Sequence, residues 1–162
     1  MTDLVYAVGD VHGQITQFAE MSAQIDEHSD SHEPGIRKIV WLGDYVDRGP
    51  DSKAVLDGMI NAPMKGFEEI FLMGNHEIMM LDALHGGDEL LWLQNGGYAT
   101  LESYPQKEDG INIKYDIPKE HIDWMKNLSK MYIEGPFVFV HATWIVTGKL
   151  IPLILSNLLY NH

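Results

Sequence analysis

Three stretches of the chain share one construction: an apolar run, a glycine, and then a side chain that can bind a metal ion. The runs Leu4–Val8, Ile39–Leu42 and Ile70–Met73 lead into Gly9-Asp10, Gly43-Asp44 and Gly74-Asn75. Such runs are typical of buried strands. In an α/β sheet the functional groups lie just past the carboxyl ends of the strands. The repetition therefore favours a functional site at one edge of a sheet over three unrelated polar turns.

Segments with helical spacing separate these strands, over about residues 15–28 and 52–60. Alternation of strands and helices predicts a layered α/β fold. Farther along, we expect helices over 77–84, 88–94, 98–104 and 118–130, with a polar loop after Tyr104. Two short strands are predicted within 131–140, divided by Gly135-Pro136, and the second ends at His141.

Composition limits the classes of protein to which the chain can belong. Its 162 residues fit one domain, and 45% apolar with 22% charged residues is typical of a soluble globular protein. A net charge of −13 argues against nucleic-acid binding, which requires a basic face. Cysteine is absent, so any metal must be held by His, Asp, Asn and water. The N-terminus has no basic and apolar leader, which predicts a cytoplasmic protein with no membrane partner.

The residues after the strands have the chemistry of a two-metal centre. Asp10 and His12 are two apart in extended backbone, so both can bind one ion, and this donor pair suits Mn, Fe or Zn. Asp44 can use its two carboxylate oxygens to bridge that ion to a second metal ion. Asn75 and His141 are the other predicted ligands of this second ion. Two such ions are the standard arrangement for hydrolysing phosphate esters. The predicted cofactors are two divalent metal ions, with Mn²⁺ preferred to Fe or Zn.

Three further residues have predicted catalytic roles. His76 lies next to Asn75 and is expected to protonate the leaving alkoxide, with Asp47 fixing its tautomer. Arg48 has a planar guanidinium group that can donate hydrogen bonds to two phosphate oxygens at once. The alternative for His76 is a helix-capping or core histidine, which its neighbours disfavour.

These motifs carry a family resemblance. The blocks Gly9–Gly13, Gly43–Gly49 and Gly74–Glu77 resemble those of the calcineurin-like metallophosphoesterases. They are most similar to the phosphoprotein phosphatase branch, in particular the small bacterial and phage serine/threonine phosphatases. Residues 92–104 and 139–142 fit the same group, so the resemblance covers about residues 3–142.

The resemblance implies an αββα fold, a β-sandwich flanked by helices, and attack of a dimetal-bound hydroxide with no phosphoenzyme. It makes Asp10, His12 and Asp44 ligands of one metal and Asp44, Asn75 and His141 ligands of the other. Arg48 becomes the phosphate clamp and His76, steadied by Asp47, the general acid. The expected substrate is a phosphoprotein or a small phosphate ester.

The chain departs from the family at two places. Met73 stands where many relatives carry a phosphate-binding arginine, and the further histidine expected after His141 has no counterpart but the terminal His162. Residues 143–162 form an apolar tail without acidic side chains, after a metallophosphoesterase domain over 1–142. We interpret this as a truncated or frameshifted C-terminus, with the later strands of the second sheet missing. A variant tail that docks on the sheet and a membrane anchor are the alternatives.

Two other functions compete with a serine/threonine phosphatase. The first is a dinucleoside polyphosphate hydrolase built on the same centre, against which Asp47 weighs because that group usually lacks an acidic residue there. The second is an impaired remnant that binds metal or a partner. An exposed apolar sheet face would also favour self-association of the chain.

Overall fold

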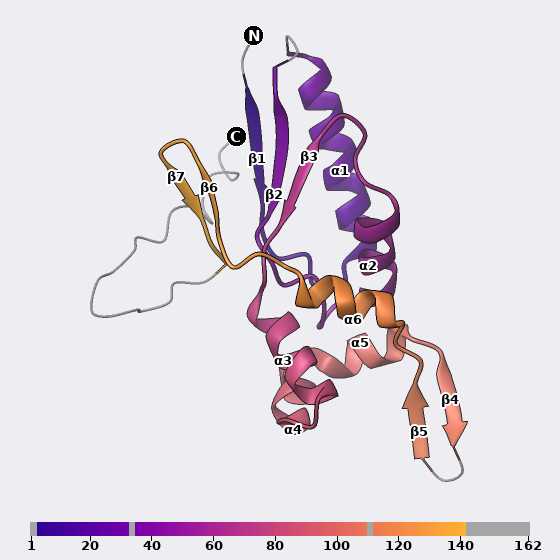
Figure 1. The fold of residues 1–162 in the computed structure, drawn as a ribbon. Coiled ribbons are helices and arrows are strands. Elements are labelled where there is room, and N and C mark those ends of the chain that lie inside the picture. The colour runs from indigo at the N-terminus through magenta and orange to yellow at the C-terminus, as the bar shows by residue number, and fades with distance from the viewer. Residues whose placement is uncertain (1–2, 33–34, 110–111, 142–162) are drawn as a thin grey trace, which may run out of the picture.

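A parallel three-stranded sheet forms the centre of the computed structural model, which describes residues 3–32, 35–109 and 112–141. The strands β1 (Leu4–Val8), β2 (Arg37–Trp41) and β3 (Glu68–Phe71) lie in the order β1-β2-β3. Helices α1 (Ile15–Asp30) and α2 (Ser52–Asn61) connect them and lie along one side of the sheet (Figure 1). The predicted α/β class is confirmed.

Strand register decides which side chains face the two helices. Tyr6 pairs with Ile39 and Val8 with Trp41, so these residues share one face of the sheet. On that face Trp41 stacks on Phe71 and also meets the ring of Phe18 from α1. Burial of these aromatic rings holds the helices on the sheet.

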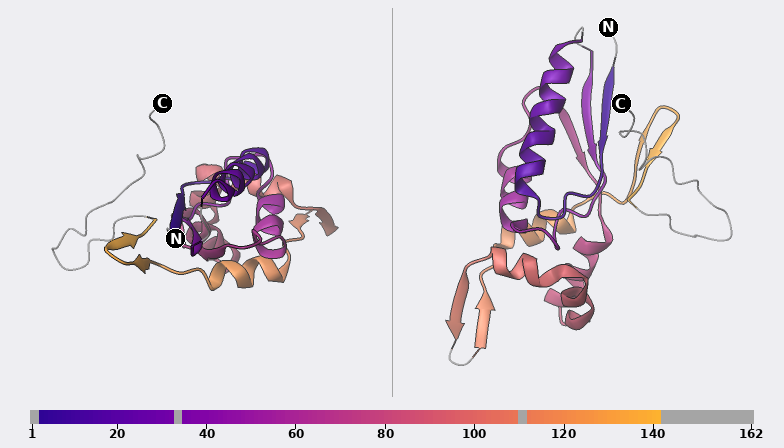
Figure 2. Two further views of the ribbon diagram at one scale, coloured as in Figure 1. Left: turned by 90° about the horizontal axis from the view of Figure 1, so that it is seen from above. Right: turned by 180° about the vertical axis from the view of Figure 1, so that it is seen from behind.

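A cap of short helices lies beyond the carboxyl ends of the strands, as two opposite views show (Figures 1 and 2). It comprises α3 (Asn75–Leu84), α4 (Glu89–Trp92), the π-helical turn η1 (Leu93–Gly97) and α5 (Tyr98–Ser103). Helix α3 begins two residues earlier than predicted, because the Glu77 carboxylate accepts the Gly74 N–H at 2.9 Å and closes the first turn. Asn75 and His76 therefore belong to that turn.

The polar loop expected after Tyr104 was a wrong prediction. An antiparallel pair, β4 (Gln106–Asp109) and β5 (Asn112–Tyr115), stands there instead and projects from the cap (Figure 1). The sequence did carry a signal for the second strand, because residues 111–117 alternate between apolar (Ile111, Ile113, Tyr115, Ile117) and polar residues.

Helix α6 (Lys119–Lys126) ends four residues before the predicted Lys130. The chain leaves the helix because Ser129 pairs with the end of β3: its N–H donates to Phe71 O at 3.1 Å and its carbonyl accepts Met73 N at 2.7 Å. The tertiary contact with the sheet overrides the local preference for helix.

The predicted strand pair near residue 135 is confirmed as β6 (Tyr132–Glu134) and β7 (Phe137–Phe139). This hairpin stands on the side of the sheet opposite α1, where Lys38 Nζ of β2 donates to Tyr132 OH at 2.9 Å and to Glu134 Oε2 at 2.7 Å (Figure 2). The predicted tail over 143–162 lies outside the described residues. Within those residues, no helix has the length and apolar character needed to cross a membrane.

Candidate active site

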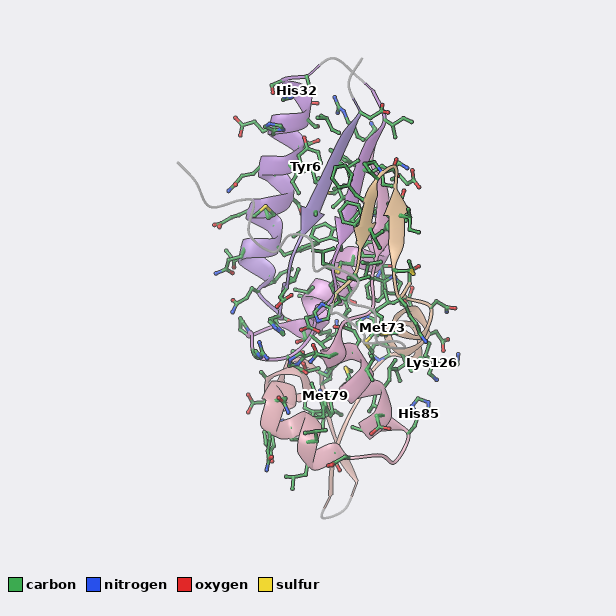
Figure 3. All side chains as sticks on the ribbon, turned by 90° about the vertical axis from the view of Figure 1, so that its left-hand side faces the viewer. Tyr6, His32, Met73, Met79, His85 and Lys126 are labelled. Atoms are coloured by element: carbon green, nitrogen blue, oxygen red, sulfur yellow. The ribbon has the colours of Figure 1, made fainter. Side chains whose placement is uncertain are left out.

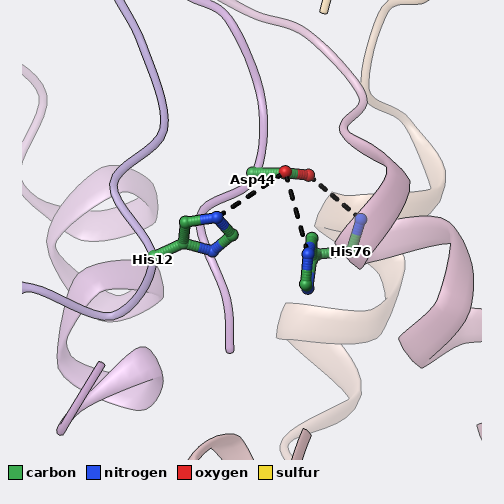
Figure 4. A group of neighbouring side chains, drawn as sticks. All are labelled: His12, Asp44 and His76. Carbon is green, nitrogen blue, oxygen red and sulfur yellow. Dashed lines mark hydrogen bonds and ion pairs between the residues drawn. The ribbon is translucent and has the colours of Figure 1, made fainter. Parts of the chain in front are cut away.

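The candidate site lies where β1, β2 and β3 end and the cap begins. The loop after β1 supplies His12, the loop after β2 supplies Asp44, and the first turn of α3 supplies His76 (Figure 4). Asp44 Oδ2 lies 3.8 Å from His12 Nε2 and 4.0 Å from His76 Nε2, and Asp44 Oδ1 accepts the backbone N–H of His76 at 3.0 Å. The three loops thus meet at one carboxylate.

The imidazoles around Asp44 all present the same ring nitrogen to it. His12 Nδ1 donates to Val46 O at 2.8 Å, and His141 Nδ1 donates to Leu42 O at 2.9 Å. His76 Nδ1 lies 2.7 Å from Asp47 Oδ2. Because each Nδ1 is hydrogen-bonded to an acceptor outside the site, each Nε2 faces the site, which is the arrangement of metal-binding histidines in general.

A second group shares Asp44 with the first. Asp44 Oδ2 lies 3.3 Å from His141 Nε2, which is also 3.0 Å from Asn75 Oδ1. Asp10 belongs to this neighbourhood, and its Oδ2 lies 3.8 Å from His12 Nε2. All five predicted ligands are therefore brought together, although they come from four separate segments of the sequence.

The ligand atoms fall into two groups that could each hold an ion: His12, Asp44 and His76 form one, and Asp10, Asp44 and His141 form the other. This grouping differs from the predicted division, in which Asp10 belongs with His12 and His76 is not a ligand. Asp44 is common to both groups, which fits the bridging position expected of it. Carboxylates and free imidazole nitrogens within 4.8 Å of one another suit a divalent transition metal.

Electrostatics at Asp44 favour its charged form. Burial alone would raise the pKa of this carboxyl group, but hydrogen bonds from His141 and from the His76 N–H outweigh burial and lower the pKa. The same contact with Asp44 raises the pKa of His141. A carboxylate that stays ionised while buried is ready to bind a cation.

Backbone strain is concentrated at this site. Within the described part of the chain, the non-glycine residues with positive φ are His12 (43°), Asp44 (56°), Asp47 (73°) and Arg48 (67°). Left-handed conformations cost free energy for residues with a Cβ atom, and they persist where the surrounding structure enforces them, often at functional sites. All four residues have predicted roles: His12 and Asp44 as metal ligands, Arg48 as the phosphate clamp, and Asp47 as the partner of His76.

Asp47 lies behind His76, away from Asp44, and is completely buried. Its carboxylate accepts His76 Nδ1–H at 2.7 Å, Thr100 Oγ1–H at 2.7 Å and Trp92 Nε1–H at 3.0 Å. The predicted pairing of Asp47 with His76 is thus present as a hydrogen bond. Sequence reasoning assigned no role to Trp92 or Thr100, although a buried indole N–H always needs an acceptor.

Arg48 is exposed and reaches across the mouth of the site. Its guanidinium donates to His12 Nε2 at 2.9 Å and to His76 Nε2 at 3.0 Å. Both donors therefore bind ring nitrogens that lie within 4.0 Å of Asp44. They supply positive charge on a chain whose net charge is −13.

Glu77 is a further site residue that sequence reasoning missed. It is completely buried, and its carboxylate accepts the N–H groups of Asp44 (2.9 Å), Gly74 (2.9 Å), Tyr45 (2.7 Å) and Val46 (3.2 Å). Burial and then the nearby charge of Asp44 raise the pKa of Glu77 to about 7. The signal in the sequence was the glutamate at the third position of a helix, where capping glutamates occur.

Met73, which stands where an arginine was expected, lies at the junction of β3 and α3 (Figure 3). It is half-buried, and its N–H donates to Ser129 O at 2.7 Å. Its apolar side chain has no hydrogen-bond donor, so this position supplies no second phosphate-binding group beside Arg48.

Comparison with known proteins places these residues in a family. The model of the family described as calcineurin-like phosphoesterase matches residues 4–153. The chain belongs to this family of hydrolases, which uses divalent metals. The His and Asp groups described above fit that use.

Individual relatives divide between two activities. Serine/threonine-protein phosphatase 2 of Escherichia coli is 37% identical over 64% of this chain and 44% of its own length. A symmetrical bis(5'-nucleosyl)-tetraphosphatase of Nitrosospira multiformis is 29% identical over 85% of this chain and 42% of its own. Serine/threonine-protein phosphatase 2 of Salmonella typhimurium is 29% identical over 80% of this chain and 56% of its own length. The chain spans about half the length of the curated relatives it matches.

Among solved structures, a crystal structure of a proposed diadenosine tetraphosphatase aligns with a TM-score of 0.47 at 21% identity. The alignment covers 80% of this chain and 47% of that one. At this level the likeness carries no argument about activity.

Proposed function

We propose that the protein is a metal-dependent phosphomonoesterase that acts on phosphoserine or phosphothreonine in proteins. The observation that carries this proposal is the position of the His76–Asp47 pair. It lies immediately beside Asp44, the carboxylate shared by both groups of potential metal ligands. A proton donor next to a two-metal centre is what hydrolysis of an alkyl phosphate requires.

The metal ligands in this proposal are Asp10, His12, Asp44, Asn75 and His141, with two Mn²⁺ ions as the preferred occupants. Bound there, the ions would lower the pKa of a water molecule from ~15.7 towards neutrality and neutralise charge on the phosphoryl oxygens. The fixed Nδ1 donations of His12 and His141 hold their Nε2 atoms in place before an ion arrives.

The chain's own residues bind the phosphate and supply the proton. Arg48 now donates to two imidazoles, and phosphate oxygens are stronger acceptors than these nitrogens, so the guanidinium turns to the substrate when it binds. His76 Nε2 is thereby released, takes up a proton from solvent, and donates it to the oxygen of the departing alkoxide. Asp47 holds the other ring nitrogen at 2.7 Å and stabilises the positively charged ring.

A dinucleoside polyphosphate hydrolase is the second candidate function, because relatives with that name match most of the chain. The leaving group in that reaction is a nucleotide phosphate, which departs readily as an anion and needs no proton. The buried Asp47 and its contact with His76 serve no evident purpose in such a reaction. This contrast favours an alkyl phosphate as the substrate.

We also propose that the β6–β7 hairpin is the beginning of the second sheet of the αββα sandwich. Its position opposite α1 and its contacts with Lys38 of β2 support this assignment. The family's known fold adds support.

Measuring His76→Asn on two substrates tests the mechanism. We expect kcat for a phosphoserine peptide to fall by ~10²–10⁴, the usual worth of a positioned acid, and to fall much less for p-nitrophenyl phosphate. The bound metal, counted by elemental analysis, should not change. Equal losses on both substrates would contradict the proton-donor role, and loss of a metal ion would make His76 a ligand.

The same panel includes diadenosine tetraphosphate as a third substrate. The unmodified chain should turn over the phosphopeptide with a higher kcat/KM than the dinucleotide. The reverse order would favour the second candidate. Metal binding without turnover of any substrate would indicate a chain that holds ions but lacks activity.

A further inference from the structure

We propose that Trp92 and Thr100 are positioning residues for proton donation by His76, acting through Asp47. The inference rests on the proposed function, because it assumes that His76 is the proton donor. It assigns a role in the reaction to α4 and α5, the helices of the cap that contain Trp92 and Thr100 and contribute neither a predicted metal ligand nor a predicted phosphate contact.

The hydrogen bonds at Asp47 leave its carboxylate a single orientation. Thr100 Oγ1 donates to Oδ1 at 2.7 Å, and Trp92 Nε1 lies 3.0 Å from both oxygens. His76 Nδ1 donates to Oδ2 at 2.7 Å. Because Asp47 has no exposure to solvent, water cannot replace any of these donors.

The backbone of Asp47 is held by the same group of side chains. Its N–H donates to Thr100 Oγ1 at 2.8 Å and to Ser52 Oγ at 3.0 Å, and these two hydroxyls lie 2.9 Å apart. Asp47 needs this support because its φ of 73° is a strained conformation. Thr100 therefore fixes both the backbone and the carboxylate of the residue that orients His76.

The π-helical turn η1 makes room for the indole of Trp92. A Cβ atom at Gly97 would lie 2.6 Å from the indole ring, so only glycine at this position allows the ring to lie where it does. In the same turn, Gly96 O accepts the N–H of Arg48 at 3.2 Å. The turn thus holds Trp92 against Asp47 and also anchors the residue next to Asp47.

A purely structural role is the competing explanation, since Trp92 is 2% exposed and belongs to the hydrophobic core. The two explanations differ in what the N–H and O–H groups do. Core packing depends on the ring, whereas positioning depends on donation to Asp47. Trp92→Phe and Thr100→Val each remove the donor and keep most of the buried volume, and Thr100→Ser restores the hydroxyl.

We expect Trp92→Phe and Thr100→Val to lower kcat for a phosphoserine peptide by about 10- to 100-fold, the usual cost of losing a residue that orients a catalytic group. For p-nitrophenyl phosphate the change should stay within about twofold, because its leaving group needs little protonation. The KM values and the bound metal should not change, and Thr100→Ser should recover most of the lost kcat.

Trp41→Phe is the matched control. Trp41 Nε1 also donates to a carboxylate, Glu69 Oε1 at 3.0 Å, and the residue is completely buried, but it lies in the sheet. This variant should lower the melting temperature about as much as Trp92→Phe and leave the ratio of the two kcat values unchanged. If Trp41→Phe also changed the ratio of the two kcat values, general destabilisation would explain the effect of Trp92→Phe, and no positioning role would be needed.

Proton NMR of the metal-free protein gives a readout that does not depend on turnover. The His76 Nδ1–H resonance, assigned by its absence in His76→Asn, should move downfield in Trp92→Phe and stay in place in Trp41→Phe. The reason is that Asp47, having lost a donor, becomes a stronger acceptor from His76.

The outcomes separate this inference from the proposed function. If His76→Asn loses equal activity on both substrates, the proposed function fails first. If His76→Asn discriminates between the substrates but Trp92→Phe and Thr100→Val do not, and the Nδ1–H resonance does not move, the positioning role is overturned while the proposed function stands.

Discussion

At the scale of single residues, Glu77 joins two of the strand-end loops. Its carboxylate oxygens accept three N–H groups from the loop after β2 and one from the loop after β3. All four of these donors are backbone groups. Glu77 therefore sets the distance between Asp44 and the first turn of α3.

Glu77→Gln should weaken both folding and metal binding. A glutamine side chain offers one acceptor oxygen and an NH₂ group that would face backbone N–H donors, which costs about 2–3 kcal/mol in free energy of unfolding. We expect a lower Mn²⁺ affinity by calorimetry at a temperature where the variant is still folded.

Glu69→Gln is the control for Glu77→Gln. Glu69 also accepts two N–H groups, from Trp41 Nε1 and Met64 N, but it lies on β3 away from the site. This variant should lose stability and keep its Mn²⁺ affinity. Unchanged Mn²⁺ affinity in Glu77→Gln would show that Glu77 supports the fold alone.

The residues with predicted metal and catalytic roles could be located from the sequence because each lies in a segment that directly follows a predicted strand. Asp10, Asp44 and Asn75 are placed by that pattern, and His12 and His76 lie close to them in the sequence. Glu77, Trp92 and Thr100 could not be given roles in the same way. Their partners are backbone groups or Asp47, distant by up to 53 positions, and only the folded chain brings them into contact.

At the scale of elements, the loops after β1 and β2 pack with their backbones in contact. Val11 N and His12 N both donate to Asp44 O, and Asp51 N donates to Gly13 O. Gly49 lies so close to the first loop that a Cβ atom there would be 1.9 Å from the carbonyl oxygen of His12. This contact fixes His12 relative to Asp44.

Gly49→Ala should force the two loops apart. Overpacking against backbone costs about 2–3 kcal/mol, which lowers the Tm of a domain of this size by roughly 5–10 °C. Gly9→Ala is the matched control in the first loop, because a Cβ atom there has nothing within 4 Å. Thermal unfolding of both variants checks the expectation, and equal Tm values would contradict the tight packing.

Elements with an apolar pattern were predicted closely, and those fixed by tertiary contacts were not. The strand β1 has the predicted bounds, and α1 and α2 differ from theirs by one or two residues. The end of α6 depends on the pairing of Ser129 with Leu72, the residue directly after β3, and these two residues are 57 positions apart in the sequence. No local periodicity can carry that information.

At the scale of the whole molecule, the sheet has one well-covered face and one face that the described residues cover in part. Parallel sheets are normally buried on both faces. The face opposite α1 and α2 carries Val5, Lys38 and Glu68 in one row, and the β6–β7 hairpin approaches it. Exposed apolar side chains remain on and beside this face: Val5, Ile36, Ile133 and Phe137.

This surface leads us to predict self-association of the chain. Val5 is 38% exposed on β1, which is an edge strand of the sheet formed by the described residues. Unpaired backbone and apolar side chains at such an edge favour contact with a second copy. Val5→Lys places a charge there, next to Lys38 in the paired strand, and should shift the population towards monomer. Thr16→Lys, on the exposed surface of α1, adds the same charge elsewhere and should leave the association unchanged. Light scattering over a range of concentrations measures all three proteins, and a parent chain that stays monomeric throughout would show that this face is not an association surface.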